Sequence, residues 1–68
     1  MDREELEHAR KKAGVSREDL CQYLGISVTT YYRKCNGKSE FTLTEIKKIV
    51  ELLKLDSPVA IFFPEKVS

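Results

Sequence analysis

Three glycines mark the ends of short helical segments in the first half of this chain. They stand at positions 14, 25 and 37, and each follows a stretch whose apolar residues recur at helical spacing. Glycine readily adopts the left-handed backbone that ends a helix, so these positions indicate where helices stop. The pattern predicts a first helix over about residues 2–13, a second between Ser16 and Gly25, and a third from Ser27 to about Asn36.

Two further helices are indicated in the second half. Thr42 and Glu45 have the spacing of a capping box, which opens a fourth helix. Proline is tolerated at the first helical position, so Pro58 begins a short fifth helix, which Pro64 ends. The buried face of the fourth helix is predicted to contain Leu43, Ile46, Ile49, Val50 and Leu53. With no alternating run that predicts a strand, the chain is expected to be all-α, a compact five-helix domain over residues 1–68 with a short tail from about residue 64.

Size and composition exclude several classes of protein. Sixty-eight residues leave no room for a catalytic cleft beside the core, and no nucleophile–base pair is evident, so an enzyme is not expected. No stretch approaches the ~20 apolar residues that span a membrane. The acidic segment MDREELEHAR lacks the apolar run of a signal peptide, which predicts a cytoplasmic protein.

The cysteines are interpreted as buried thiols. Cys21 and Cys35 are the only two, and with no export signal a disulfide is the less favoured alternative. His8 is the only histidine, and it lacks the local pairing with cysteines that a zinc site needs. We therefore expect no metal, no cofactor and no small-molecule ligand.

The net charge of +1 hides a segregation of charge along the chain. Residues 1–9 carry one basic and four acidic residues, a net of −3, and residues 39–68 have a net of −1. Residues 10–38 carry seven basic residues against two acidic ones, a net of +5. A basic middle between acidic ends is what a local phosphate-binding surface needs, although a solvated lysine-rich helix face would give the same count.

The second and third helices are joined by a very short turn centred on Gly25. Two short helices joined in this way cross steeply and share a small core. Cys21 is small enough to let the third helix approach, while the wedge is filled by Leu20, Leu24, Ile26 and Tyr31. A side chain at Gly25 is expected both to strain the turn and to crowd the helices. The pattern indicates a helix-turn-helix at about residues 17–36.

Residues 6–55, LEHARKKAGVSREDLCQYLGISVTTYYRKCNGKSEFTLTEIKKIVELLKL, resemble the Cro/C1 (XRE-type) family of helix-turn-helix proteins. The segment TTYYRKCNGKSEFT, residues 29–42, is similar to small phage and prophage Cro-type regulators. The resemblance implies a lambda repressor-like domain whose third helix enters the major groove of double-stranded DNA. It also implies a homodimer on a palindromic operator.

The resemblance further assigns contacts to individual residues. It places base contacts at the start of the third helix, on Val28, Thr29, Tyr32 and Arg33. It places phosphate contacts at the start of the second helix and after the third, on Ser16, Arg17, Thr30, Asn36 and Lys38. Val28 alternatively covers the helix junction. Within the first helix, Arg10 is the basic residue that we expect to reach a phosphate.

Two positions depart from the family pattern. Arg17 stands where the family commonly has glutamine, which leaves a phosphate contact plausible and a base-supporting role in doubt. Lys34 stands where the family commonly has an apolar residue. The inward face of the third helix is therefore drawn through Tyr31 and Cys35, four residues apart, with the stem of Lys34 lying along the surface.

The segment PVAIFF near the C-terminus suggests association. Ile61, Phe62 and Phe63 cannot all face inward on a helix of one or two turns. We expect Ile61 and one phenylalanine to face inward, and the dimer interface to come from Phe62 and Phe63.

Two classes of function remain. The leading hypothesis is a sequence-specific DNA-binding transcriptional regulator, a phage Cro-type repressor that acts by occupying its operator. The alternative is a protein-interaction module, antitoxin-like or antirepressor-like, that keeps the fold without reading DNA. The adjacent tyrosines 31 and 32 and Lys34 would suit a protein surface, whereas the basic segment favours DNA.

Overall fold

The computed structural model describes residues 1–66, and these residues form five α-helices and one short 3₁₀ turn without a β-strand. The elements are α1 (Arg3–Lys12), α2 (Arg17–Leu24), α3 (Val28–Cys35), α4 (Leu43–Leu53), α5 (Pro58–Phe62) and the 3₁₀ turn η1 (Pro64–Lys66). The all-helical prediction is confirmed, and the expected limits of α1, α2, α3 and α5 lie within one residue of the observed ones. None of the helices in residues 1–66 has the length and apolar character needed to cross a bilayer.

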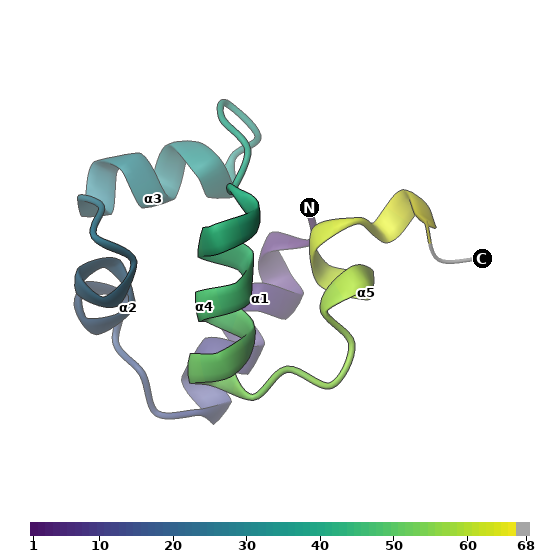
Figure 1. Cartoon of the computed structure of the whole chain (residues 1–68), viewed down its shortest axis with the longest axis horizontal. Coiled ribbons are helices and arrows are strands. Elements are labelled where there is room, and N and C mark those ends of the chain that lie inside the picture. Colours follow the sequence, from purple (N-terminus) through teal and green to yellow (C-terminus); the bar gives the residue numbers. More distant parts are fainter. Residues whose placement is uncertain (67–68) are drawn as a thin grey trace.

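The helices are arranged so that α3 lies at one edge of the molecule (Figure 1). In this view α3 runs across the top of the molecule, above α2 and the start of α4, while α1 lies behind α4 and α5 lies on the opposite side from α2. The backbone N–H of Asp2 donates to the carbonyl of Ile61 at 2.7 Å, which joins the start of the chain to α5. The edge position leaves one long face of α3 without helical neighbours.

One core joins all five helices. Leu6, Leu20, Tyr31 and Ile49 are fully buried, and each comes from a different helix among the first four. Ile61 and Phe62 supply the contribution of α5. A cluster built from every helix is what a chain of this length needs, since a small domain has little apolar area to bury.

The predicted buried face of α4 is partly wrong. Ile49 and Leu53 are buried and Ile46 and Val50 half-buried, but Leu43 is 67% exposed. A helix turns about 100° per residue, which puts Leu43 within about 20° of the half-buried Val50 but two turns earlier, at the first residue of α4. Its side chain therefore points into solvent at the first turn.

Gly25 is required for its backbone conformation alone. It ends α2 with φ +75°, in the left-handed region, as predicted. A Cβ atom at this position would meet no atom within 4 Å. The expected crowding between the helices is therefore wrong, because the turn projects this position away from the helix junction.

Both cysteines are free and buried, as predicted. Cys21 lies in α2 and Cys35 in the last turn of α3, and both belong to the core cluster. Burial raises the pKa of each thiol, so neither is a ready thiolate at neutral pH. The thiols act as small apolar side chains.

The two phenylalanines of the C-terminal segment have different surroundings. Ile61 and Phe62 are buried, and the ring of Phe62 packs edge-to-face on Phe41 with centroids 5.7 Å apart. Phe63 is 42% exposed. The expectation that Ile61 and one phenylalanine face inward is confirmed, but Phe62 as a dimer-interface residue is wrong, because its side chain is already enclosed by its own chain.

Candidate nucleic-acid interface

The helix-turn-helix is held by a serine cap at the start of each helix. Ser16 Oγ accepts from the backbone N–H of Asp19 at 3.0 Å, and Ser27 Oγ accepts from that of Thr30 at 3.1 Å. Such caps satisfy backbone donors that the first turn of a helix leaves free. Within the turn, the N–H of Ile26 donates to the carbonyl of Cys21 at 3.0 Å. The geometry of the turn thus fixes the angle between α2 and α3.

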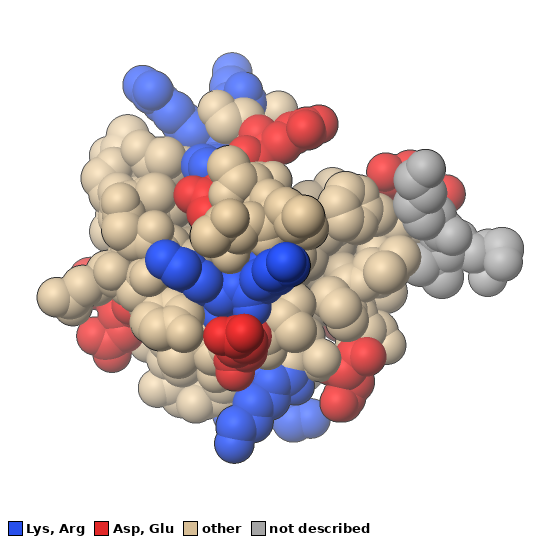
Figure 2. Space-filling view, viewed as in Figure 1, with Lys and Arg blue, Asp and Glu red and all other residues tan. Residues whose placement is uncertain are grey.

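The burial of Tyr31 and Cys35 turns the opposite side of α3 outward. Thr29, Tyr32 and Arg33 are exposed on that side. A shallow hollow is lined by Thr29, Tyr32, Arg33, Asn36, Lys38 and Ser39. Basic side chains project beyond the edge of the molecule that α3 and the following loop occupy (Figure 2). Three predicted base-contacting residues and two predicted phosphate-contacting residues therefore share one surface.

Val28 and Thr30 lie at the border of this surface. Val28 is half-buried and packs against the core, which agrees with the alternative that it covers the helix junction. Thr30 is half-buried, and its hydroxyl accepts a hydrogen bond from Ser27 Oγ at 2.9 Å.

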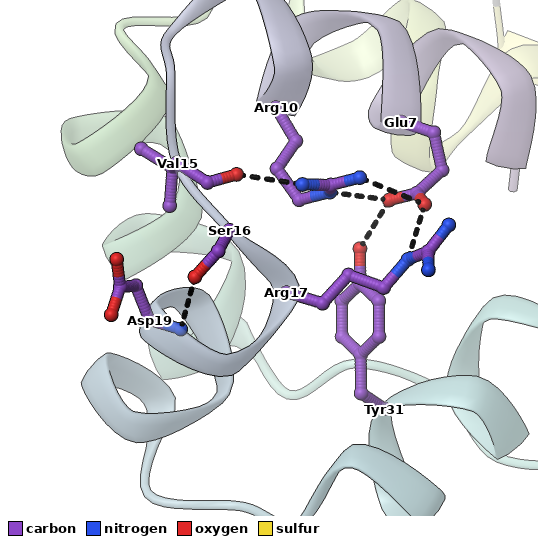
Figure 3. Close-up of polar contacts among 7 residues, drawn as sticks. All are labelled: Glu7, Arg10, Val15, Ser16, Arg17, Asp19 and Tyr31. Atoms are coloured by element: carbon purple, nitrogen blue, oxygen red, sulfur yellow. Dashed lines mark hydrogen bonds and ion pairs between the residues drawn. The ribbon is translucent and has the colours of Figure 1, made fainter.

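A carboxylate on α1 joins the first three helices. Glu7 accepts from Arg10 Nε at 2.9 Å, from Arg17 Nε at 2.9 Å and from the hydroxyl of Tyr31 at 3.0 Å. Arg10 Nη1 also donates to the carbonyl of Val15 at 2.7 Å, in the loop between α1 and α2 (Figure 3). The carboxylate therefore ties α1 to the first residue of α2 and to the centre of α3.

The partners of Glu7 keep it ionised. Burial alone would raise the pKa of its carboxyl, but the hydrogen bonds from Arg10, Arg17 and Tyr31 outweigh it and lower the pKa from the ordinary 4.5 to about 2. Burial in turn raises the pKa of the Tyr31 hydroxyl, with the adjacent carboxylate adding to the effect. At neutral pH the cluster contains one carboxylate, two guanidinium groups and one neutral phenol.

The prediction that Arg10 contacts a phosphate is wrong. Arg10 is only 7% exposed, and its guanidinium is held by Glu7 and the carbonyl of Val15. A buried cation needs such partners, so the side chain cannot reach outward without breaking them. Arg17 differs, because its side chain is 41% exposed.

The prediction that the aliphatic stem of Lys34 lies along the surface is also wrong. Its side chain is 11% exposed, and Nζ donates to Glu45 Oε1 at 2.6 Å. The same oxygen accepts from the backbone N–H of Thr42 at 2.8 Å, completing the predicted capping box of α4. The Lys34 ammonium lies 5.7 Å from the ring centroid of Phe41. The end of α3 is thus joined to the start of α4.

These ion pairs reduce the basic charge that is free on the surface. Of the seven basic residues between positions 10 and 38, Arg10, Arg17 and Lys34 are paired with Glu7 or Glu45. Within residues 1–66, no cluster of histidine, cysteine or carboxylate side chains could hold a metal ion. The exposed side chains around α3 offer hydrogen bonds and charge contacts.

A comparison with protein families matches residues 6–58 to the family described as Helix-turn-helix, which covers more than three quarters of the chain. The chain belongs to this XRE/Cro-C1 type helix-turn-helix family. No curated protein and no solved structure matched the chain.

Membership of the helix-turn-helix family accounts for the fold and the general kind of function. The five helices form a compact lambda repressor-like domain, with α2 and α3 as the helix-turn-helix. The family consists of DNA-binding transcriptional regulators. This protein is therefore a DNA-binding regulator of the helix-turn-helix type.

Sequence reasoning missed three residues around the helix-turn-helix. Glu7 and Glu45 were not among the predicted site residues, although Glu7 is bonded to Arg17 and Glu45 to Lys34. Arg3 was also missed, and its Nη1 donates to Asn36 Oδ1 at 2.6 Å. The sequence contained a usable signal only for Glu45. Lys34 occupies a position where the family commonly has an apolar residue, and a lysine that is buried there needs an acidic partner.

The link between α3 and α4 predicts an asymmetric response to mutation. Glu45→Ala removes the carboxylate half of the capping box and leaves the Lys34 ammonium without its partner, so we expect a loss of about 2 kcal/mol in the free energy of unfolding. Lys34→Met keeps an aliphatic stem beside Phe41 and leaves Glu45 bonded to Thr42, so the loss should be about half as large. Urea denaturation followed by circular dichroism measures both. Equal losses would show that the bond between the Thr42 N–H and the Glu45 carboxylate contributes nothing beyond the ion pair.

Proposed function

We propose that this protein is a sequence-specific regulator of the Cro type, a repressor that binds double-stranded DNA and acts by occupying its operator. The observation that carries the proposal is the outward face of α3, where Thr29, Tyr32 and Arg33 are exposed side by side. A single α-helix fits the major groove of B-form DNA, and the position of α3 at the edge of the domain leaves it accessible.

The side chains on this face suit base recognition. Arg33 offers a planar guanidinium for bidentate contact with guanine, and Thr29, four residues earlier, offers a hydroxyl on the same side of the helix. Tyr32 and the half-buried Val28 would contact bases or thymine methyl groups beside them. Phosphate contacts are proposed on either side of α3, from Ser16, Arg17, Thr30, Asn36 and Lys38.

A dimer on a palindromic operator is supported by an apolar hollow between α4 and α5. It is lined by Ile46, Lys47, Val50, Glu51, Pro58, Val59 and Phe63. Val59 is 49% and Phe63 42% exposed, so two large apolar side chains, one in α5 and one at its C-terminal cap, are left facing solvent. Exposed apolar surface of this kind commonly serves association, and a two-fold dimer would place two α3 helices about one DNA turn apart.

Replacing Phe63 by aspartate should abolish the dimer without unfolding the monomer. The buried residues Ile61 and Phe62 keep α5 in place, whereas a charge at Phe63 would be placed inside the contact. Sedimentation equilibrium of the variant should give a monomer at concentrations where the wild type dimerises. Tyr23→Asp is the matched control, since Tyr23 is 44% exposed on α2, and it should leave association unchanged. A wild type that is monomeric at all concentrations and binds operator as one chain would refute the dimer.

Selection of bound sequences from a random duplex library tests the proposal as a whole. A sequence-specific regulator should enrich one motif, and a dimer should enrich a palindrome with half-sites about one helical turn apart. Binding to all duplexes alike would show that α3 contacts only phosphate. A folded protein that binds no duplex would favour the protein-interaction alternative.

A further inference from the structure

The guanidinium of Arg17 is held from two sides at the start of α2. Its Nε donates to Glu7 Oε1 at 2.9 Å, and its central carbon lies 5.6 Å from the centroid of the Tyr32 ring. Within residues 1–66, its two Nη atoms make no hydrogen bond, and the side chain is 41% exposed. Arg17 is thus anchored at one nitrogen while the other two nitrogens are free to donate.

Glu7 is itself fixed by groups on its own helix and on α3. The hydroxyl of Tyr31, a fully buried residue of α3, and Nε of the buried Arg10 both donate to its second oxygen. Figure 3 shows the carboxylate between these groups, with Arg17 approaching from the side of α2. A carboxylate with three donors from three helices has little freedom to move.

From this arrangement we infer that Glu7 is a positioning residue for DNA binding, which holds Arg17 so that both Nη groups face a phosphate. The inference rests on the proposed function, because it assumes that the α2–α3 surface binds DNA. Glu7 does not touch DNA in this arrangement. It acts through Arg17, the residue that stands where the family commonly has glutamine.

The physical reason is preorganisation. A free arginine side chain loses substantial rotamer entropy when it binds a phosphate, and a side chain already held in place loses less. Arginine alone among the basic residues can do both tasks at once, since Nε serves the carboxylate while the Nη pair serves the phosphate. Lysine has a single nitrogen, which either Glu7 or the phosphate would take.

Simple electrostatics predicts the opposite effect of Glu7→Gln on DNA affinity. Glu7 is an anion near a surface proposed to bind a polyanion, so removing its charge should strengthen binding to any DNA. The cluster as a whole is nevertheless cationic, because Arg10 and Arg17 together outweigh one carboxylate. The two explanations can therefore be separated by the direction of a single mutational effect.

The experiment measures affinity for the selected duplex and for random duplex at several salt concentrations. The variants are Glu7→Gln, Arg17→Ala, the double variant, Arg17→Lys and the control Glu4→Gln, which removes the same charge from an exposed site on α1. We expect Arg17→Ala to weaken binding roughly fivefold to tenfold and to lower the salt slope by about one ion. Glu7→Gln should weaken binding several-fold, and adding it to Arg17→Ala should cause no further loss.

The double variant separates positioning from a merely structural role. If Glu7 only supports the fold, Glu7→Gln weakens binding equally with and without Arg17, which overturns the inference. Should Glu7→Gln fail to fold, Arg17→Lys decides, because that side chain lies outside the core: affinity equal to the wild type would show that charge alone matters. A wild type that binds no duplex refutes the proposed function, whereas a wild type that binds while Glu7→Gln behaves like Glu4→Gln refutes only the positioning role.

Discussion

Replacing Arg33 by alanine is expected to weaken binding to the selected duplex by about 1–3 kcal/mol, and binding to random duplex far less. The reason is that a bidentate contact with guanine exists only where the sequence supplies one. Arg33 is exposed on the outward face of α3 and has no ion-pair partner within residues 1–66, so its guanidinium is free for this contact. Thr29→Ala should show the same pattern with a smaller effect.

Lys38 supplies the matched comparison. It follows α3, lines the same hollow as Arg33, and is exposed. Lys38→Ala should weaken binding to all sequences about equally and lower the salt slope by about one ion, because a phosphate contact carries no sequence information. Titrations of both variants on both duplexes at several salt concentrations provide the test. If Arg33→Ala lost the same affinity for both duplexes, α3 would contact only phosphate.

Acid should destabilise the domain through Glu7. The pKa of Glu7 is about 2 in the folded protein against an ordinary 4.5, so between these values the unfolded chain binds a proton that the folded chain does not. The stabilisation is therefore fully present above pH 4.5 and is lost as the pH falls toward 2. Between pH 6 and pH 3 this one group should lower the free energy of unfolding by about 2 kcal/mol, and Glu45, whose pKa is also lowered, should add to the loss.

Urea denaturation at several pH values measures the effect. In Glu7→Gln the difference between pH 6 and pH 3 should shrink by about 2 kcal/mol, because the titrating group is gone. Glu4→Gln, an exposed change on the same helix, should leave the pH profile close to that of the wild type. A profile of Glu7→Gln that matches the wild type would show that the carboxylate is not held by its three donors.

The local features of the fold were predictable because their causes are local. Ser16, Ser27 and Thr42 each cap the helix that follows, through hydrogen bonds to a residue three positions later. Gly25 ends α2 because only its own backbone angle matters there, and the neighbourhood is empty. Spacing of a few residues is enough to recognise such features.

Burial at the margins of the helices was harder to predict. Phe62 and Phe63 are adjacent and chemically identical, yet one packs on Phe41 and the other faces solvent. Leu43 lies on nearly the same side of α4 as the half-buried Val50, yet it is 67% exposed. Which of several apolar residues is buried depends on where neighbouring helices lie, and the periodicity of one helix does not contain that information.

The sequence by itself determined that there are five α-helices, the limits of all of them except α4, the helix-turn-helix and the outward position of Thr29 and Arg33 on α3. Only the tertiary structure decided which charges are free. Arg10 and Arg17 are both bonded to Glu7, across three and ten positions of sequence, yet Arg10 is buried whereas the side chain of Arg17 is 41% exposed. Helix formation depends on neighbours along the chain, whereas the availability of a charge depends on which distant groups folding brings within hydrogen-bond distance.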